Sequence, residues 1–116
     1  MSQEIALLMA DTKCSAVRVL DMHEVSPMCD FFVVANGTSP RQMRSVIDDI
    51  EDLAEGRGSK RLPNGRSTSE TWIALDLGDI IVHVFTPDAR IFYDIDNLWA
   101  DAKDVDFKQS RLEAVK

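Results

Sequence analysis

Apolar residues recur at two different spacings along the chain, and these spacings predict the secondary structure. The segment from Ser2 to Lys13 has apolar residues at helical spacing and is predicted to be a helix with one side on a core. Ala16 to Met22 alternates apolar with polar residues, and Asp30 to Ala35 is a dense run of β-branched and aromatic residues. Both are predicted strands, the second near the centre of a sheet.

The clearest helix signal follows a turn at 36–38. Ser39 is placed to cap a helix, Pro40 suits its first position, and Gln42 is the partner at the third helical position in a capping box. A continuous apolar stripe follows, made of Met43, Val46, Ile47, Ile50, Leu53 and Ala54. Two glycines are predicted to end this helix, Gly56 and Gly58.

A tight hairpin is predicted in the second half of the chain. Thr71 to Leu77 and Ile80 to Phe85 are strand-like runs separated by Gly78 and Asp79. The preceding stretch, 57–69, is rich in turn-forming residues and is predicted to hold at most a short edge strand near Leu62.

The C-terminal region is predicted to turn after Pro87 and then to form a short acidic helix behind Asp94 or Asp96 as cap. Its apolar residues recur at helical spacing, Ile95, Leu98, Trp99 and Ala102. We therefore expect an α/β (α+β layered) fold, a mixed β-sheet covered by helices. Residues 1–105 are predicted to form a single domain, and 106–116 a flexible tail.

Composition fits one domain with a modest core, because the chain has 116 residues of which 45% are apolar and 28% charged. No apolar run approaches the ~18 residues that span a bilayer, and the N-terminus lacks a basic flank, so a cytoplasmic protein is expected. Cys14 and Cys29 have neither zinc-site nor disulfide-framework spacing and are expected to be free thiols.

The formal net charge of -7 argues against a general nucleic-acid binder and favours a basic protein partner. Between Asp88 and Asp106 there are six acids and two bases, a negative field that can steer such a partner, although a solvated face looks similar. The segment from Gly56 to Ser69 holds four bases and no acid. That loop could touch RNA phosphate, and solubility explains it equally well.

An enzyme hypothesis starts from the turn Gly37-Thr38-Ser39, which could receive a phosphate. Two acidic pairs could hold magnesium, Asp76 with Asp79 and Asp94 with Asp96. A nucleotidyltransferase places its acidic pair on a strand about a dozen residues after the turn. Here that stretch, around Asp48 and Asp49, is predicted helix, so catalysis and a metal cofactor are not expected.

Aromatic and histidine side chains are the other candidates for a site. His83 lies between two valines of a predicted strand, and an exposed contact residue and a hydrogen-bonded sheet histidine are equally compatible with that position. For Trp72 and Trp99, packing in the core and anchoring an interface are equally compatible with the pattern.

Three long segments carry a family resemblance: Asp30 to Gln42 (DFFVVANGTSPRQ), Trp72 to Phe85 (WIALDLGDIIVHVF) and Arg90 to Ala102 (RIFYDIDNLWADA). They resemble the ribosomal silencing factor family, also called Iojap-like. The resemblance covers about Ile5 to Val105. It implies a nucleotidyltransferase-like fold without the catalytic residues.

The resemblance also implies a translational repressor that binds ribosomal protein fourteen (uL14) on the 50S subunit, blocks association with the small subunit, and forms a homodimer when free. Separately, hydropathy, charge and motif spacing lead us to expect no membrane, cofactor or specific nucleic acid. Nine residues are implied at the partner-binding site, Trp72, Asp76, His83, Phe85, Arg90, Tyr93, Asp94, Leu98 and Trp99. A large-subunit assembly factor is the alternative, followed by the magnesium-dependent nucleotidyltransferase.

Overall fold

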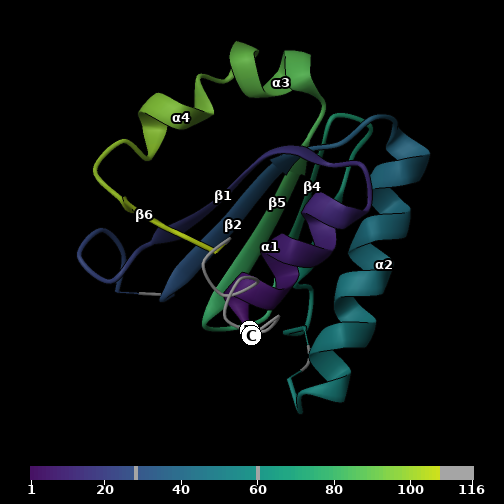
Figure 1. Ribbon diagram of the computed structural model, residues 1–116, viewed down its shortest axis with the longest axis horizontal. Helices are drawn as coiled ribbons and strands as arrows, with labels where there is room; N and C mark the ends of the chain where they lie inside the picture. Colours follow the sequence, from purple (N-terminus) through teal and green to yellow (C-terminus); the bar gives the residue numbers. More distant parts are fainter. Residues whose placement is uncertain (28, 60, 108–116) are drawn as a thin grey trace, which may run out of the picture.

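A six-stranded mixed sheet organises the chain, with strand order β3-β4-β5-β2-β1-β6 (Figure 1). The computed structural model describes residues 1–27, 29–59 and 61–107. The elements are α1 (Ser2–Asp11), β1 (Ser15–Asp21), β2 (Phe31–Asn36), α2 (Pro40–Gly56), β3 (Arg66–Thr68), β4 (Trp72–Asp76), β5 (Ile80–Phe85), α3 (Pro87–Phe92), α4 (Ile95–Leu98) and β6 (Lys103–Val105).

The sheet is mixed because β2 and β5 pair in parallel, while every other neighbouring pair is antiparallel. A parallel pair needs a long crossover connection, and α2 lies in the connection between these two strands. Figure 1 shows α1 and α2 on one face of the sheet, while α3 and α4 follow the end of β5. The predicted mixed sheet covered by helices is confirmed.

The start of α2 matches its sequence signal closely. The Ser39 side chain accepts a hydrogen bond from the Gln42 backbone N–H at 3.1 Å. The Gln42 amide in turn accepts one from the Thr38 N–H at 3.0 Å and donates one to the Thr12 carbonyl at 2.8 Å. These bonds satisfy free N–H groups at the helix start and tie it to the end of α1.

Two apolar cores lie on opposite faces of the sheet. The larger one joins α1 and α2 to the sheet and contains most of the predicted α2 stripe, while Leu53 is only partly buried. The smaller one lies on the other face beside α4. Its buried members are Leu20, Met22, Cys29, Val34, Phe85, Ile95 and Ala102.

The predicted edge strand near Leu62 is wrong, because the edge strand is Arg66–Thr68 and pairs with β4. The chain makes a turn first, in which the Gly65 N–H donates to the Leu62 carbonyl at 2.8 Å. A Cβ on Gly65 would lie 2.7 Å from that carbonyl oxygen and 2.9 Å from the one of Asp76. The strand therefore begins only after a glycine that allows this close approach.

The C-terminal region differs most from its prediction. The segment after Pro87 is helix α3 rather than a turn, because the Thr86 hydroxyl accepts a hydrogen bond from the Ala89 N–H at 3.3 Å and caps it. The next helix, α4, has only four residues and leaves Leu98 exposed. Asp94 precedes α4 at φ 52° without a side-chain cap bond. Strand β6, which the sequence did not predict, then pairs with β1.

The predicted tail begins at Asp106, yet Phe107 is only 7% exposed and packs against the larger core. The remainder of that tail, 108–116, lies outside the described residues. No helix in the described part of the chain is both long and apolar enough to cross a membrane.

Candidate interaction surface

Four large apolar side chains lie exposed on α3, α4 and the turn between them. Their exposed fractions are 78% for Ile91, 80% for Phe92, 50% for Tyr93 and 64% for Leu98. We call these four residues the α3–α4 patch. Elsewhere in the described residues, the large apolar side chains that are exposed are Val25 and Leu62. A gathering of exposed apolar groups on one short segment is typical of an interaction surface.

Arg90 anchors this segment to the sheet. Its side chain is 6% exposed, and Nη1 donates to the Ala16 carbonyl at 2.7 Å and to Asn36 Oδ1 at 3.2 Å. Ala16 lies in a bulge of β1 at φ 49°, a backbone conformation that is unfavourable for a residue with a Cβ. The bulge places its carbonyl where the guanidinium can reach it.

Asp96 extends this network to β1 and, through Arg18, to the edge strand β6. It accepts two hydrogen bonds from Arg90 and one, at 2.6 Å, from Arg18 on β1. Arg18 also donates to both carboxylate oxygens of Asp104 on β6, at 2.8 and 3.0 Å. The hydrogen bond from Arg90 is the main cause that lowers the pKa of Asp96. Ion pairs therefore link α3, α4, β1 and β6.

Aromatic rings connect the patch to the smaller core. The ring of Tyr93 lies 5.7 Å from that of Trp72, and Trp72 lies 4.7 Å from Phe85. Trp99 contacts Phe32 at 4.7 Å and His83 at 5.0 Å between ring centroids. The Tyr93 ring of the patch thus rests on a packed aromatic layer.

His83 is the buried centre of this layer. Trp72 Nε1 donates to its Nδ1 at 3.1 Å, so the neutral ring carries its proton on Nε2. Within the described residues, Nε2 has no hydrogen-bond partner. Burial lowers the pKa of His83 to about 4. Of the two interpretations of His83, the structure shows the hydrogen-bonded sheet histidine.

The structure separates the nine predicted site residues into three groups. Tyr93, Asp94 and Leu98 are exposed at the patch, with Trp72 and Trp99 partly buried beside it. His83, Phe85 and Arg90 are buried, so they support the surface and do not form it. Asp76 lies at the other end of β4, where its carboxylate accepts a hydrogen bond from the Gly78 N–H at 2.8 Å.

Sequence reasoning missed Ile91 and Phe92, which are the most exposed large apolar residues of the patch. They stand in the third motif beside Tyr93, in a segment predicted to be a turn. The available signal was two bulky apolar residues placed in a turn, where they have no core to enter.

The glycine turn of the enzyme hypothesis lies away from its first acidic pair. The Gly37 N–H bonds the Phe85 carbonyl at the end of β5, whereas Asp79 lies just before its start. The six residues of β5 therefore separate the glycine turn from the first acidic pair, roughly 20 Å at the usual rise per residue. Of the second pair, Asp96 is engaged by two arginines.

The basic loop does not present free arginines to RNA. Arg57 bonds Glu4, Arg61 lies 3.4 Å from Glu51, and Arg66 lies 2.6 Å from Asp48. These pairs neutralise the loop against α1 and α2. Lys60, the fourth base of this stretch, lies outside the described residues.

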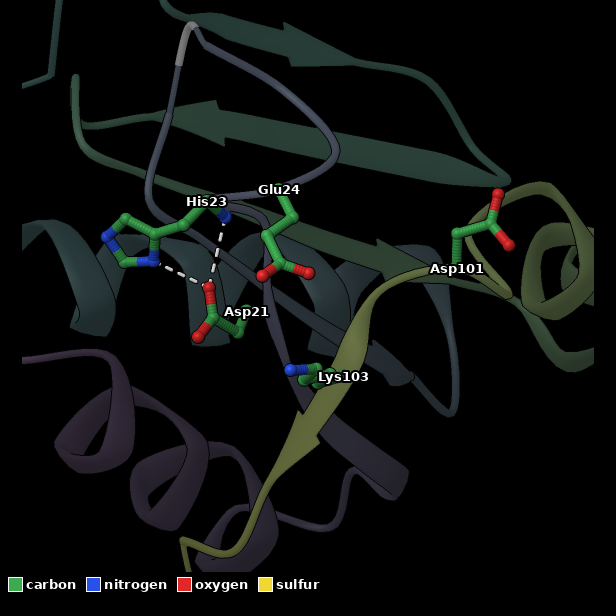
Figure 2. Close-up of a pocket in the computed structure, with 5 residues that line it drawn as sticks. All are labelled: Asp21, His23, Glu24, Asp101 and Lys103. Atoms are coloured by element: carbon green, nitrogen blue, oxygen red, sulfur yellow. Dashed lines mark hydrogen bonds and ion pairs between the residues drawn. The ribbon is translucent and has the colours of Figure 1, made fainter.

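A small polar hollow of about 130 Å³ lies at the end of β1. Figure 2 shows His23 bonded to Asp21 through its ring and its backbone N–H, with Asp101 at the far end. The hydrogen bond with Asp21 raises the pKa of His23. Within the described residues, no group of three or more His, Cys, Asp and Glu side chains is arranged to hold a metal ion.

Comparisons with known proteins give the family. The sequence matches the family described as "Ribosomal silencing factor during starvation" over residues 1–116. It is 33% identical to a ribosomal silencing factor of Bacillus subtilis over 114 residues, covering 92% of this chain and 97% of that protein. A relative of the same name from Halalkalibacterium halodurans is 34% identical over 100 residues, covering 84% of each. A crystal structure of a Chromobacterium violaceum protein superposes with a TM-score of 0.75 at 28% identity, covering 86% of this chain and 87% of that one. The chain therefore belongs to the ribosomal silencing factor family.

Proposed function

We propose that this protein represses translation in the cytoplasm by binding ribosomal protein fourteen (uL14) on the large (50S) subunit, where it blocks association with the small subunit. Family membership supports a ribosomal role. The observation that supports docking by a surface is the α3–α4 patch, with Phe92 80% exposed and Ile91 78% exposed on a firmly held segment.

The patch has the chemistry of a protein-binding surface. Leaving large apolar groups in water is unfavourable, by about 25 cal/mol for each Å² that a partner would cover. Aromatic side chains are frequent energetic anchors of interfaces, and Phe92, Tyr93 and the partly buried Trp72 and Trp99 supply them.

The charge of the same region favours a basic partner. Arg90, one of only two bases between Asp88 and Asp106, is turned inward and neutralised by Asp96. The remaining acids therefore dominate the field around the patch. Such a field accelerates encounter with a basic ribosomal protein, while the apolar contacts supply most of the affinity.

In this proposal the protein represses translation by occupying a surface of the large subunit. A protein seated on the face of the large subunit that meets the small subunit excludes the latter, because the two cannot fill the same space. No bond is made or broken. This agrees with the separation of the glycine turn from the first acidic pair by the length of β5.

The test is sedimentation of the purified protein with isolated large subunits, followed by addition of small subunits, over a range of salt. Binding to large subunits together with a loss of joined ribosomes supports the proposal. Binding without that loss favours the alternative of an assembly factor, and absence of binding refutes both.

The same patch is our candidate for a homodimer contact in the free protein, because a second copy would cover the same apolar groups. Dimerisation and binding to the large subunit would then compete for the α3–α4 patch. Sedimentation velocity of wild type and of Phe92→Ser tests this contact, and an unchanged dimer in the variant would exclude the patch from it.

A further inference from the structure

A groove runs beside the α3–α4 patch, between α3 and the residue that precedes β4. Its volume is about 470 Å³, and it is lined by Thr71, Thr86, Asp88, Ala89, Phe92 and Tyr93. The Thr86 N–H donates to the Thr71 carbonyl at 3.0 Å, so the two walls are joined by the backbone. This hydrogen bond braces the base of the groove.

The lining combines two aromatic rings with one carboxylate. Phe92 and Tyr93 are exposed, and their rings meet edge to face at 5.0 Å between centroids. The Asp88 side chain is exposed and has neither a hydrogen bond nor an ion pair to any described residue. Aromatic faces attract cations, and a nearby carboxylate adds an opposite charge.

The surroundings select against an anionic ligand. From Asp88 to Asp106 there are six acids and two bases, and Arg90, the base nearest in sequence, is buried against Asp96. Nucleic-acid bases could stack on the rings, but their phosphates would meet this negative field. A cation carried on an apolar stem suits both the rings and the carboxylate.

We propose that this groove receives an arginine side chain of a basic protein partner, with the guanidinium stacked on Phe92 or Tyr93 and paired with Asp88. The inference rests on the proposed function, and it adds the side chain that the site recognises. Arginine suits the groove better than lysine, because its planar guanidinium stacks on rings and bonds a carboxylate through two N–H groups.

The first test needs no ribosome. Isotope-labelled protein is titrated with an acetylated, amidated tripeptide Gly-Arg-Gly, and its amide signals are followed by NMR. The same tripeptides with citrulline or leucine in place of arginine are the controls, since citrulline keeps the shape and loses the charge. We expect shifts at Thr71, Ala89 and Tyr93, with citrulline binding at least about fivefold more weakly.

Variants of Asp88 test whether its carboxylate pairs with the arginine. Asp88→Asn is expected to weaken binding of the arginine peptide about threefold, and Asp88→Glu to retain it. Asp101→Asn is the matched control, because it removes one negative charge from the same acidic region outside the groove. Equal losses in Asp88→Asn and Asp101→Asn, or equal binding of the leucine peptide, would overturn the arginine site.

Sedimentation with large subunits forms the second test and separates the two proposals. If wild type binds and Asp88→Asn binds about fivefold more weakly, the partner uses the groove. If Asp88→Asn binds subunits like wild type, the inference fails while the proposed function stands. If wild type does not bind, the proposed function fails, and the peptide titration still decides whether the groove takes arginine.

Discussion

Arg90 grips both carboxylate oxygens of Asp96, with Nε and Nη2 donating at 3.2 and 2.9 Å. The arginine belongs to α3 and the aspartate to α4, so this pair fixes the angle between the two helices that carry the α3–α4 patch. The remaining Arg90 bonds, to Ala16 and Asn36, attach the pair to the sheet. The shape of the exposed surface thus depends on a buried charge.

Replacing Arg90 with methionine is expected to destabilise the protein by about 2–4 kcal/mol in urea unfolding, because the Ala16 carbonyl and Asn36 lose a buried donor. Arg57→Met removes an ion pair between two well-exposed side chains and is the control. We expect it to cost less than about 1 kcal/mol. Equal costs for the two variants would contradict a supporting role for Arg90.

Stability is expected to fall in acid because of His83. Its pKa is about 4 in the folded protein against an ordinary 6.5. Between these values the unfolded chain therefore binds more protons than the folded protein. The contribution of His83 to the free energy of unfolding is fully present above pH 6.5 and is lost as pH falls toward 4. From pH 7.5 to 5 the loss is about 2 kcal/mol, measured by urea unfolding with tryptophan fluorescence.

His83→Gln is the matched variant, since glutamine can still accept the Trp72 hydrogen bond and does not titrate. It should remove most of this acid loss. His23→Gln is the control of opposite sign, because the folded pKa of His23 is raised. The contribution of His23 to the free energy of unfolding is present below its unfolded pKa and is lost as pH rises. Replacing His23 therefore cannot reduce the loss of stability in acid. An unchanged pH profile in His83→Gln would refute the assignment.

Phe92→Ser should separate binding from folding. The side chain is 80% exposed, so the free energy of unfolding should change by no more than about 0.5 kcal/mol. Affinity for large subunits should fall by about 2 kcal/mol, roughly thirtyfold, if the ring is a central anchor. Leu62→Ser changes an exposed apolar residue in the loop before β3 and should leave binding unchanged. Full binding by the Phe92 variant would argue against the patch.

Gly65→Ala tests the turn before the edge strand. The added Cβ would meet two backbone oxygens at 2.7 and 2.9 Å, and we expect a loss of at least about 1 kcal/mol in thermal or urea unfolding. Gly56→Ala is the control, because nothing lies within 4 Å of its added Cβ at the end of α2. It should be neutral or slightly stabilising. A neutral Gly65 variant would show that the turn can relax.

Local signals in the sequence predicted the first helix, the capped α2 and the β4–β5 hairpin, because spacing, caps and turn residues act over a few neighbours. Ser39 and Gln42 made the start of α2 predictable in this way. Strand β6 was missed because three residues, Lys103 to Val105, carry no alternating pattern and become a strand only by pairing with β1.

The sequence by itself determined the first helix, the capped α2, the β4–β5 hairpin, the acidic surface around the patch and the motifs that resemble the family. Tertiary structure decided which aromatic residues are exposed. Trp72 and Trp99 lie against His83, whereas Phe92 and Leu98 are exposed to solvent. Only the folded chain brings Arg90 to Ala16 and Asn36, because a guanidinium can be buried only where distant backbone and side-chain acceptors converge on it.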